Sequence, residues 1–343
     1  HMSDGIVIRM TGTFLLLLLQ FSEVFPQSAT RQSVRLMFYN VENLFDIYDD
    51  STTDDNEFLP GSLRRWNYRR YEKKIWSLYK AITAAGEWSP PEIIGFCEVE
   101  NRKVLEDLIR TTNLSKFDYG ILHEDSPDPR GIDVCLIYRK GVVDLKNWKF
   151  LSPDISYSDG TSTRSVLYAE FLTGGDTIHV FVNHWPSRRG GVLAGEPLRE
   201  SIADMLRQKI DSLAFVRSSR VKVIITGDLN ASPDDDMVRM LSGPYRSGIR
   251  IINLSEDTGK SNGSYRYRGI WEMIDQVLVS EWLLDCSDGI FTGKDLFRVF
   301  KPGFLLREDP LYPGLSPFST WNGYRYLGGF SDHLPVLLDL KVR

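Results

Sequence analysis

Carboxylate and amide side chains follow two apolar runs of the sequence, where they could bind a metal ion or orient water. Glu98 comes directly after five mostly apolar residues, and Asp228 and Asn230 follow the run 223–226. Burying an unpaired carboxylate is costly, so Glu98 is expected to be an exposed strand end, a salt-bridge partner or a metal ligand. Asp228 and Asn230 stand at alternate positions and would project to the same side of an extended chain.

Two histidines have comparable settings. His184 follows another apolar run, and His333 lies just before the last one. His333 with a carboxylate such as Asp275, which lies inside an apolar run, would form an acid/base or phosphate-binding pair. His184 and Asn230 could donate hydrogen bonds to phosphoryl oxygens as negative charge builds. Asp228 could orient or deprotonate the attacking water.

Together these side chains suit metal-assisted hydrolysis of a phosphate ester. Glu98 and Asp332 offer hard oxygen ligands, which favour Mg²⁺, with Mn²⁺ or Ca²⁺ as alternatives. No spacing of Cys and His in the sequence is typical of a zinc site. The sequence therefore predicts a magnesium-dependent reaction at phosphorus.

A basic, glycine-rich stretch follows His184 and could contact the substrate. Arg188 and Arg189 precede two glycines, and paired guanidinium groups suit phosphate recognition. Trp185 or Trp321 could stack on a base. The alternative is that the two arginines only bridge acidic loops on the surface.

Composition is that of an ordinary globular protein. The chain has 343 residues, of which 42% are hydrophobic and 25% charged, so a disordered, collagen-like or coiled-coil chain is excluded. The net charge of -5 argues against a strongly basic coat protein for nucleic acid but permits a local basic groove. Three cysteines cannot form a dense disulfide framework. Cys97 and Cys135 lie in apolar runs and are expected to be buried thiols.

The elements that must position these residues can be read from the hydrophobic pattern. Many short strands and few helices, in mixed order, favour layered sheets over a strict alternation. Asn101 is placed to cap a helix. The expected strands are 34–39, 93–97, 132–138, 165–171, 178–182, 221–226, 273–279 and 335–340, and the expected helices are 68–85, 102–110 and 198–217.

The first 30 residues have the pattern of a signal peptide. Arg9 precedes a run of one phenylalanine and five leucines at 14–19, and small residues follow at 28–30. The run is too short to span a membrane, and the alternative is an apolar first helix or strand of the core. We expect His1 and Met2 to be a cloning remnant, residues 1–30 to be removed, and residues 31–343 to form one exported domain, periplasmic or extracellular.

Seven motifs occur in the order seen in the endonuclease/exonuclease/phosphatase superfamily, the group typified by pancreatic-type DNase and the major apurinic/apyrimidinic endonucleases. The chain resembles this superfamily over roughly residues 34–341. The motifs are Phe38-Tyr39-Asn40-Val41-Glu42-Asn43-Leu44, Gly95-Phe96-Cys97-Glu98-Val99, Arg130-Gly131-Ile132-Asp133, Asn183-His184, Gly227-Asp228-Leu229-Asn230, Ile274-Asp275 and Ser331-Asp332-His333-Leu334-Pro335.

The resemblance implies an α/β fold, a four-layer α/β/β/α sandwich of two packed mixed β-sheets flanked by helices. It also implies roles for the site residues. Glu98 would be the metal ligand, with Asn40 and Asp332 beside the metal. Asp228 and Asn230 would act on the water and the transition state. Asp275 would pair with His333, and His184 would lie near the leaving group or a phosphoryl oxygen. Two points stay open: whether Asp133 or Asp125 accompanies His184, and whether His333 or Asp228 is the base.

We therefore expect a secreted Mg²⁺-dependent phosphodiesterase that acts on nucleic acid. The alternative is a phosphatase or phosphodiesterase for an inositol phosphate, a lipid or another small phosphorylated headgroup, whose substrate would touch the aromatic segment 301–330. A non-enzymatic binding protein with an inactive site is a third hypothesis, and the complete set of site residues weighs against it. The sequence indicates no transmembrane span and no obligate protein partner.

Overall fold

The computed structural model describes residues 33–153, 163–187, 195–216, 220–256, 262–287 and 289–343. Contacts divide the chain into His1–Thr30 and Arg31–Arg343, and every element below belongs to the second unit. The predicted signal peptide lies outside the described residues, so its presence and its removal remain predictions.

The first of two large mixed sheets carries the start and the end of the described chain. β1 runs parallel to β2 and antiparallel to β19, so the carboxyl ends of β1 and β2 meet at one edge. In order, its strands are β13 (Ile290–Phe291), β19 (Val336–Val342), β1 (Ser33–Leu44), β2 (Ile93–Val99), β4 (Asp133–Arg139) and β3 (Tyr119–Leu122), and β14 (Phe297–Val299) also pairs with β19.

The second sheet has a similar pair of parallel strands at its centre. β7 runs parallel to β8, which places His184 directly opposite Asp228, and β12 runs antiparallel to β8. In order, its strands are β5 (Asp144–Leu151), β6 (Val166–Thr173), β7 (Asp176–His184), β8 (Lys222–Asp228), β12 (Asp275–Ser280) and β9 (Ile251–Asn253).

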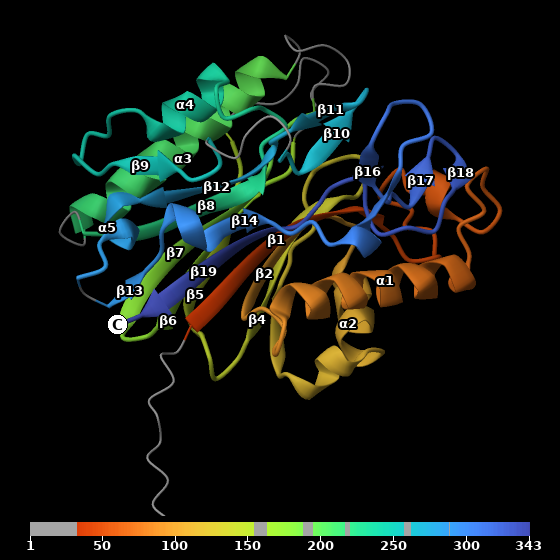
Figure 1. Ribbon diagram of the computed structural model, residues 1–343, viewed down its shortest axis with the longest axis horizontal. Helices are drawn as coiled ribbons and strands as arrows, with labels where there is room; N and C mark the ends of the chain where they lie inside the picture. Colours follow the sequence, from red (N-terminus) through yellow and green to blue (C-terminus); the bar gives the residue numbers. More distant parts are fainter. Residues whose placement is uncertain (1–32, 154–162, 188–194, 217–219, 257–261, 288) are drawn as a thin grey trace, which may run out of the picture. The chain divides into compact units, whose positions relative to one another are not determined.

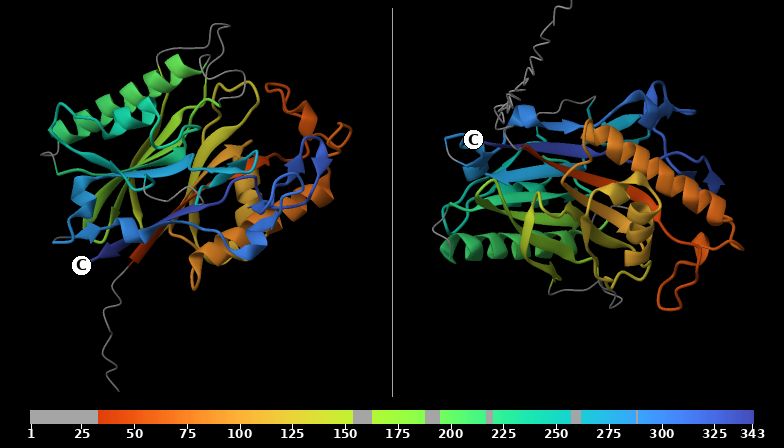
Figure 2. Two further views of the ribbon diagram at one scale, coloured as in Figure 1. Left: turned by 45° about the horizontal axis from the view of Figure 1, so that its top comes forward. Right: turned by 90° about the horizontal axis from the view of Figure 1, so that it is seen from below.

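Alternation along the strands divides the core into the layers that the resemblance implied. On β1, Phe38 packs between the sheets with Phe171 of β6, whereas Met37 packs under helix α1 (Tyr68–Gly86) with Leu78. On the other side, Phe181 of β7 packs under helix α3. Two helices thus cover each outer face (Figures 1 and 2): α1 with α2 (Arg102–Arg110) on the first sheet, and α3 (Glu196–Val216) with α4 (Asp236–Ser242) on the second.

The long helices agree with the sequence pattern, and the edge strands do not. Asn101 caps α2 as predicted, accepting a hydrogen bond from the Val104 N–H at 3.0 Å. β3 and β5 were not predicted. β5 is an edge strand with no buried position, so it lacks the apolar run by which a strand is recognised.

The segment 301–330, expected to be a loop, contains short hairpins. They are β15 (Leu306–Glu308) with β16 (Leu315–Pro317) and β17 (Trp321–Asn322) with β18 (Arg325–Tyr326). A further hairpin joins β10 (Tyr265–Tyr267) and β11 (Ile270–Glu272). The remaining elements are helix α5 (Glu281–Leu284) and the 3₁₀ turns Asn56–Phe58, Asn113–Lys116, Lys294–Leu296 and Gly303–Leu305.

Within the described ranges, every helix falls short of the length and apolar character needed to cross a membrane. Cys97 and Cys135 are buried free thiols, as predicted, and the free thiol of Cys286 is exposed.

Candidate active site

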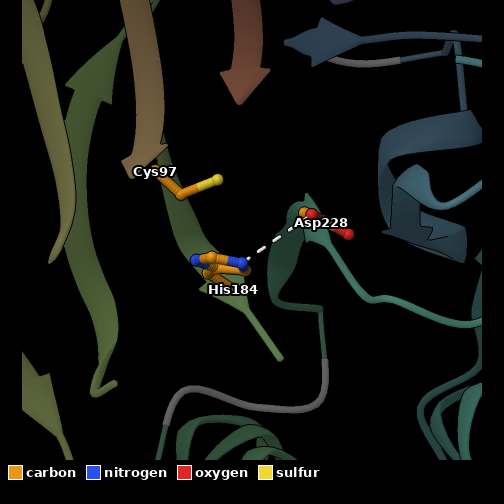
Figure 3. A group of neighbouring side chains, drawn as sticks. All are labelled: Cys97, His184 and Asp228. Atoms are coloured by element: carbon orange, nitrogen blue, oxygen red, sulfur yellow. Dashed lines mark ion pairs between the residues drawn. The ribbon is translucent and has the colours of Figure 1, made fainter. Parts of the chain in front are cut away.

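The predicted polar residues of both sheets meet where the central strands end. Register places Asn40 of β1 beside Cys97 of β2, and places Asp228 of β8 between His184 of β7 and Asp275 of β12. Figure 3 shows Cys97, His184 and Asp228 grouped in a triangle, with one ligand atom of each within 4.8 Å of the others. The packing of the two sheets therefore forms a single site from residues more than 290 positions apart in sequence.

Asn40 links the two carboxylates at the centre of the site. Its Nδ2 donates to Asp228 Oδ2 at 3.0 Å and to Glu98 Oε1 at 3.4 Å. Its Oδ1 accepts from the Glu42 N–H at 3.0 Å. Asn40 was predicted to lie beside the metal. Here its amide oxygen accepts from the backbone, and its amide nitrogen faces the carboxylates. Its most direct effect is to hold Glu98 and Asp228 together.

Glu98 occupies an unusual backbone position. Its φ is 61°, in the left-handed region that residues with a side chain seldom adopt. Glu98 Oε2 accepts from the Asn43 N–H at 3.1 Å, and 18% of its side chain is exposed. The strained turn directs the carboxylate out of the sheet, where solvent or substrate can reach it.

His184 is held as a neutral imidazole. Burial lowers its pKa well below the usual value, and the nearby guanidinium groups of Arg164 and Arg130, with His333, lower it further. Its Nε2 lies 3.8 Å from Asp228 Oδ2 and 3.9 Å from Glu98 Oε1. A neutral ring at this position can offer one N–H without adding charge.

Neither carboxylate considered as the partner of His184 contacts it within the described residues. Asp133 Oδ2 lies 3.0 Å from Nε2 of His123, and Asp125 lies 3.9 Å from the same ring. Among the described residues, Nδ1 of His184 has no hydrogen-bond partner. These two aspartates lie beside His123 instead, a histidine that the sequence gave no reason to single out.

His333 has the opposite electrostatic setting. Its Nδ1 lies 2.7 Å from Asp275 Oδ2, as predicted for the pair, and its Nε2 lies 3.9 Å from Asp228 Oδ2 and 4.0 Å from Asp332 Oδ1. Burial alone would lower its pKa, but the three carboxylates together raise it well above the usual value. The pKa values of the two buried histidines of this site are thus shifted in opposite directions, which favours a cationic ring for His333 and a neutral ring for His184.

Asp228 is the carboxylate that both histidines share. Burial, and to a smaller extent the charge of Asp275, raise its pKa, while His333 and the hydrogen bonds from Asn230 and Asn40 lower it. The net result is a pKa of about 7. A carboxyl group with a pKa near neutrality can both accept and release a proton under working conditions.

The turn after β8 fixes Asn230. Its N–H donates to Asp228 Oδ1 at 2.9 Å, and its Nδ2 donates to the Trp185 carbonyl at 3.0 Å. Gly227 makes this turn possible, because its φ is 153° and an added Cβ would lie 2.2 Å from the Asn183 carbonyl oxygen.

The prediction that Trp185 stacks on a base is wrong for this structure. Its indole is fully buried and donates to Asn183 Oδ1 at 3.2 Å. Trp321 is buried as well, against Trp66 and Tyr326. Both rings belong to the protein interior, where no ligand can reach their faces. Arg188 and Arg189, predicted to bind substrate, lie outside the described residues.

Sequence reasoning missed Arg164, which lies next to the site. Its Nη1 pairs with Asp128 Oδ2 at 2.6 Å, and its Nη2 donates to the Trp185 carbonyl at 2.9 Å. Arg130 pairs with the same aspartate at 3.2 Å. In the sequence, Arg164 is only a single arginine just before an apolar strand. The fold buries it close enough to His184 to lower the pKa of that histidine.

The donor set fits a hard divalent cation. Glu98 and Asp228 converge on a neutral amide and a neutral imidazole, so their negative charge calls for a cation. Asp332, with 34% of its side chain exposed, faces the same ring nitrogen of His333 as Asp228 does, at 4.0 Å. Carboxylate oxygens are the ligands that such cations prefer. We infer that Glu98, with Asp332 nearby, would hold the ion, which leaves Asp228 available to act on water.

Comparison with known proteins agrees with this geometry. The model of the Endonuclease/Exonuclease/phosphatase family matches residues 35–342, and the chain belongs to that family. It is therefore a metal-dependent phosphoric ester hydrolase. No curated protein matches the sequence.

Solved structures of the same fold cover nearly the whole described chain. An endonuclease/exonuclease/phosphatase from Bacteroides vulgatus is 16% identical with a TM-score of 0.58, covering 91% of this chain and 99% of its own. The human Nocturnin catalytic domain with bound sulfate is 15% identical with a TM-score of 0.54, covering 91% and 96%. A humanized D. rerio TDP2 is 13% identical with a TM-score of 0.54, covering 90% and 99%. At these identities the similarity establishes the fold alone.

Proposed function

We propose that this chain is an exported Mg²⁺-dependent phosphodiesterase that hydrolyses nucleic acid by in-line attack of water. The observation that carries the proposal is the convergence on Asp228 of two groups: the Asn40 amide, which also binds Glu98, and the His333–Asp275 pair. This set provides oxygen ligands, a proton acceptor and a cationic donor at a single point.

Each side chain has a distinct task in the proposed reaction. The divalent cation, when bound, supplies Lewis-acid stabilisation of the phosphoryl group. As the water oxygen bonds to phosphorus, the bond from phosphorus to the leaving oxygen breaks. Asp228 takes the proton of the attacking water, and His333, kept protonated by Asp275, gives its proton to the leaving oxygen. Asn230 and the neutral His184 donate hydrogen bonds as charge builds on the phosphoryl oxygens. Asp228 rather than His333 is thus our choice of base, because His333 already carries a proton.

Support for a nucleic-acid substrate comes from a relative in fold. A D. rerio TDP2 complexed with single-strand DNA product shares the fold, with 13% identity and a TM-score of 0.52. Arg188 and Arg189 follow His184 closely in sequence and are our candidates for backbone phosphate contacts.

One observation favours the headgroup alternative. Tyr265 packs its ring 4.8 Å from the His333 ring, and the hairpin that it begins contacts the hairpin of β15 and β16. Large apolar side chains are exposed on these two hairpins and their connecting loops: Tyr267, Ile270, Leu311, Tyr312 and Leu315. Such a surface would suit a substrate with an apolar portion beside its phosphate.

Export is proposed from the sequence of residues 9–30. Expression with this segment should yield a mature protein that begins between about residue 25 and residue 32, outside the cytoplasm. Sequencing of the N-terminus of the exported protein measures this directly. An intact first residue would contradict export by signal-peptide cleavage.

The substrate is tested with a panel in the presence of Mg²⁺ or of excess chelator. The panel contains plasmid DNA, an oligonucleotide, a short-chain inositol phosphate and bis(p-nitrophenyl) phosphate. We expect chelator-sensitive cleavage of nucleic acid, with KM rising steeply with salt and less steeply after Arg188→Ala and Arg189→Ala. Hydrolysis of the inositol phosphate with none of the nucleic acids would replace the nuclease proposal with the headgroup alternative.

A further inference from the structure

Lys74 is a buried cation outside the site that the reaction does not use. It lies on α1 with 1% of its surface exposed. Its Nζ donates to Thr320 Oγ1 and to the Phe330 carbonyl, each at 2.6 Å, and more weakly to the Glu42 carbonyl at 3.4 Å. Burying an ammonium group is costly unless its donors are satisfied, and here they are satisfied by two segments that border the site.

Glu42 also contacts Thr320, through the backbone rather than the side chain. Its carboxylate accepts the N–H of Thr320 and, at 3.0 Å, the N–H of Trp321. Its own N–H donates to Asn40 Oδ1 at 3.0 Å. Glu42 has a φ of 49°, an unfavourable backbone position that persists only when its surroundings hold it. Lys74 and Glu42 therefore meet at Thr320, one on the hydroxyl and the other on the backbone.

The segment that follows Thr320 leads to the candidate active site. Phe330, whose carbonyl Lys74 holds, is followed by Ser331, whose hydroxyl donates to the Asn40 carbonyl at 2.7 Å and accepts the His333 N–H at 3.1 Å. Two short paths thus run from Lys74, one through Glu42 to the amide of Asn40 and one through Phe330 to the backbone of His333.

We propose that Lys74 and Glu42 are positioning residues that set the amide of Asn40 and the imidazole of His333 in register with each other. The inference rests on the proposed function, since it assigns reaction roles to those two side chains. The orientation of the Asn40 side chain lets its amide bind both Glu98 and Asp228. The backbone position of His333 contributes to the distance between its Nε2 and Asp228. One buried network that holds both would align the carboxylate and histidine sides of the site.

Substitution of Lys74→Met, which keeps the length of the chain and removes the donors, tests this link. Lys73→Met is the matched control, because Lys73 is the neighbouring, exposed residue of the same helix. With bis(p-nitrophenyl) phosphate and saturating Mg²⁺, we expect Lys74→Met to lower kcat by about 10- to 100-fold with little change in KM, as misplaced reacting groups do. Lys73→Met should behave as the parent.

Two further measurements keep the test decisive. Thr320→Val removes the hydroxyl and retains the N–H that binds Glu42, so it should lower kcat in the same way even if Lys74→Met does not fold.

The resonance of the His333 ring in protein labelled with ¹⁵N-histidine should shift in Lys74→Met and not in Lys73→Met. Folded Lys74→Met with parental kcat and an unshifted His333 resonance would overturn the proposal. A parent that hydrolyses no phosphodiester would instead contradict the proposed function, and the resonance would still decide whether Lys74 positions His333.

Discussion

The charge on His333 depends on the carboxylates that face its ring. Asp275 Oδ2 lies 2.7 Å from Nδ1, within hydrogen-bond distance, while Asp228 Oδ2 and Asp332 Oδ1 lie 3.9 Å and 4.0 Å from Nε2. The pKa of His333 is raised and that of His184 is lowered, although both rings are buried in one site. The charged groups that surround each ring therefore give the site one cationic imidazole, at His333, and one neutral imidazole, at His184.

Removing the ring of His333 should lower kcat by at least about 10²-fold, because a positioned acid or base contributes ~10²–10⁴-fold. Asp275→Asn should cause a smaller loss, since the ring stays in place with a weaker partner. The measurement is kcat for His333→Ala, Asp275→Asn and the double variant. Losses that simply multiply in the double variant would argue that the two do not act as a unit.

The residue types at the site were predictable because few other arrangements explain carboxylates and histidines at the ends of apolar strands. The pairing of Asp275 with His333 was predicted and is confirmed. The burial of Trp185 was not predictable, because an aromatic side chain that follows a strand can point into the core or toward solvent. Arg164 was missed for a related reason: its partners Asp128 and the Trp185 carbonyl are 36 and 21 positions away, and only the fold brings them together.

At the scale of elements, the parallel pairs β1–β2 and β7–β8 determine where the site forms. Their carboxyl ends lie at one edge of each sheet, and the predicted strand ends therefore became the site. What the sequence could not predict were β5 and the hairpins of 301–330, whose short strands bury too little apolar surface to leave a pattern. Trp321 of one hairpin packs against Trp66, just before α1, and Lys74 of α1 donates to the carbonyl of Phe330, just after that hairpin.

The turn from β8 into the site should tolerate no side chain at Gly227. Gly227→Ala would place its Cβ against the Asn183 carbonyl in a strained backbone conformation, a cost of about 1–3 kcal/mol for the strain alone. We expect a lower free energy of unfolding and a large loss of kcat, because Asp228 follows directly. Gly61→Ala, at a position with open space around it, is the control, and equal effects of the two would contradict this account.

The ion pairs that join β1, β14 and β19 predict how stability changes in acid. Asp339 pairs with Arg35 at 2.6 Å and with Arg298 at 2.8 Å. Burial opposes the charge on Asp339, but these two arginines lower its pKa below the usual 3.8. A lowered pKa contributes stability that is complete above the unfolded value of 3.8 and is lost as pH falls through the folded value.

Asp339→Asn should therefore reduce the free energy of unfolding by about 1–3 kcal/mol at neutral pH, as the loss of hydrogen bonds to charged groups does. The difference from the parent should shrink below pH 3.8. Urea unfolding of both proteins at neutral and at acidic pH measures it. A difference that stays constant across this range would show that Asp339 acts through its shape rather than its charge.

Across the whole molecule, two stacked sheets bring together residues from the first and last described strands at one site. Asn40 and Ser331 are 291 positions apart and share a hydrogen bond. The four layers and family membership agree with the order of motifs in the sequence, in which each motif stands near the start or the end of a strand. The net charge of -5 means that any polyanionic substrate must be bound by local basic groups rather than by the overall field.

The central claim is that a divalent cation at Glu98 activates a phosphodiester for hydrolysis. It is tested most directly by the rate of bis(p-nitrophenyl) phosphate hydrolysis against Mg²⁺ concentration, for the parent and for Glu98→Ala. The account predicts saturable activation in the parent, no activity in excess chelator, and a folded Glu98→Ala protein that Mg²⁺ does not activate. Parental rates in Glu98→Ala, or rates that chelator leaves unchanged, would contradict it.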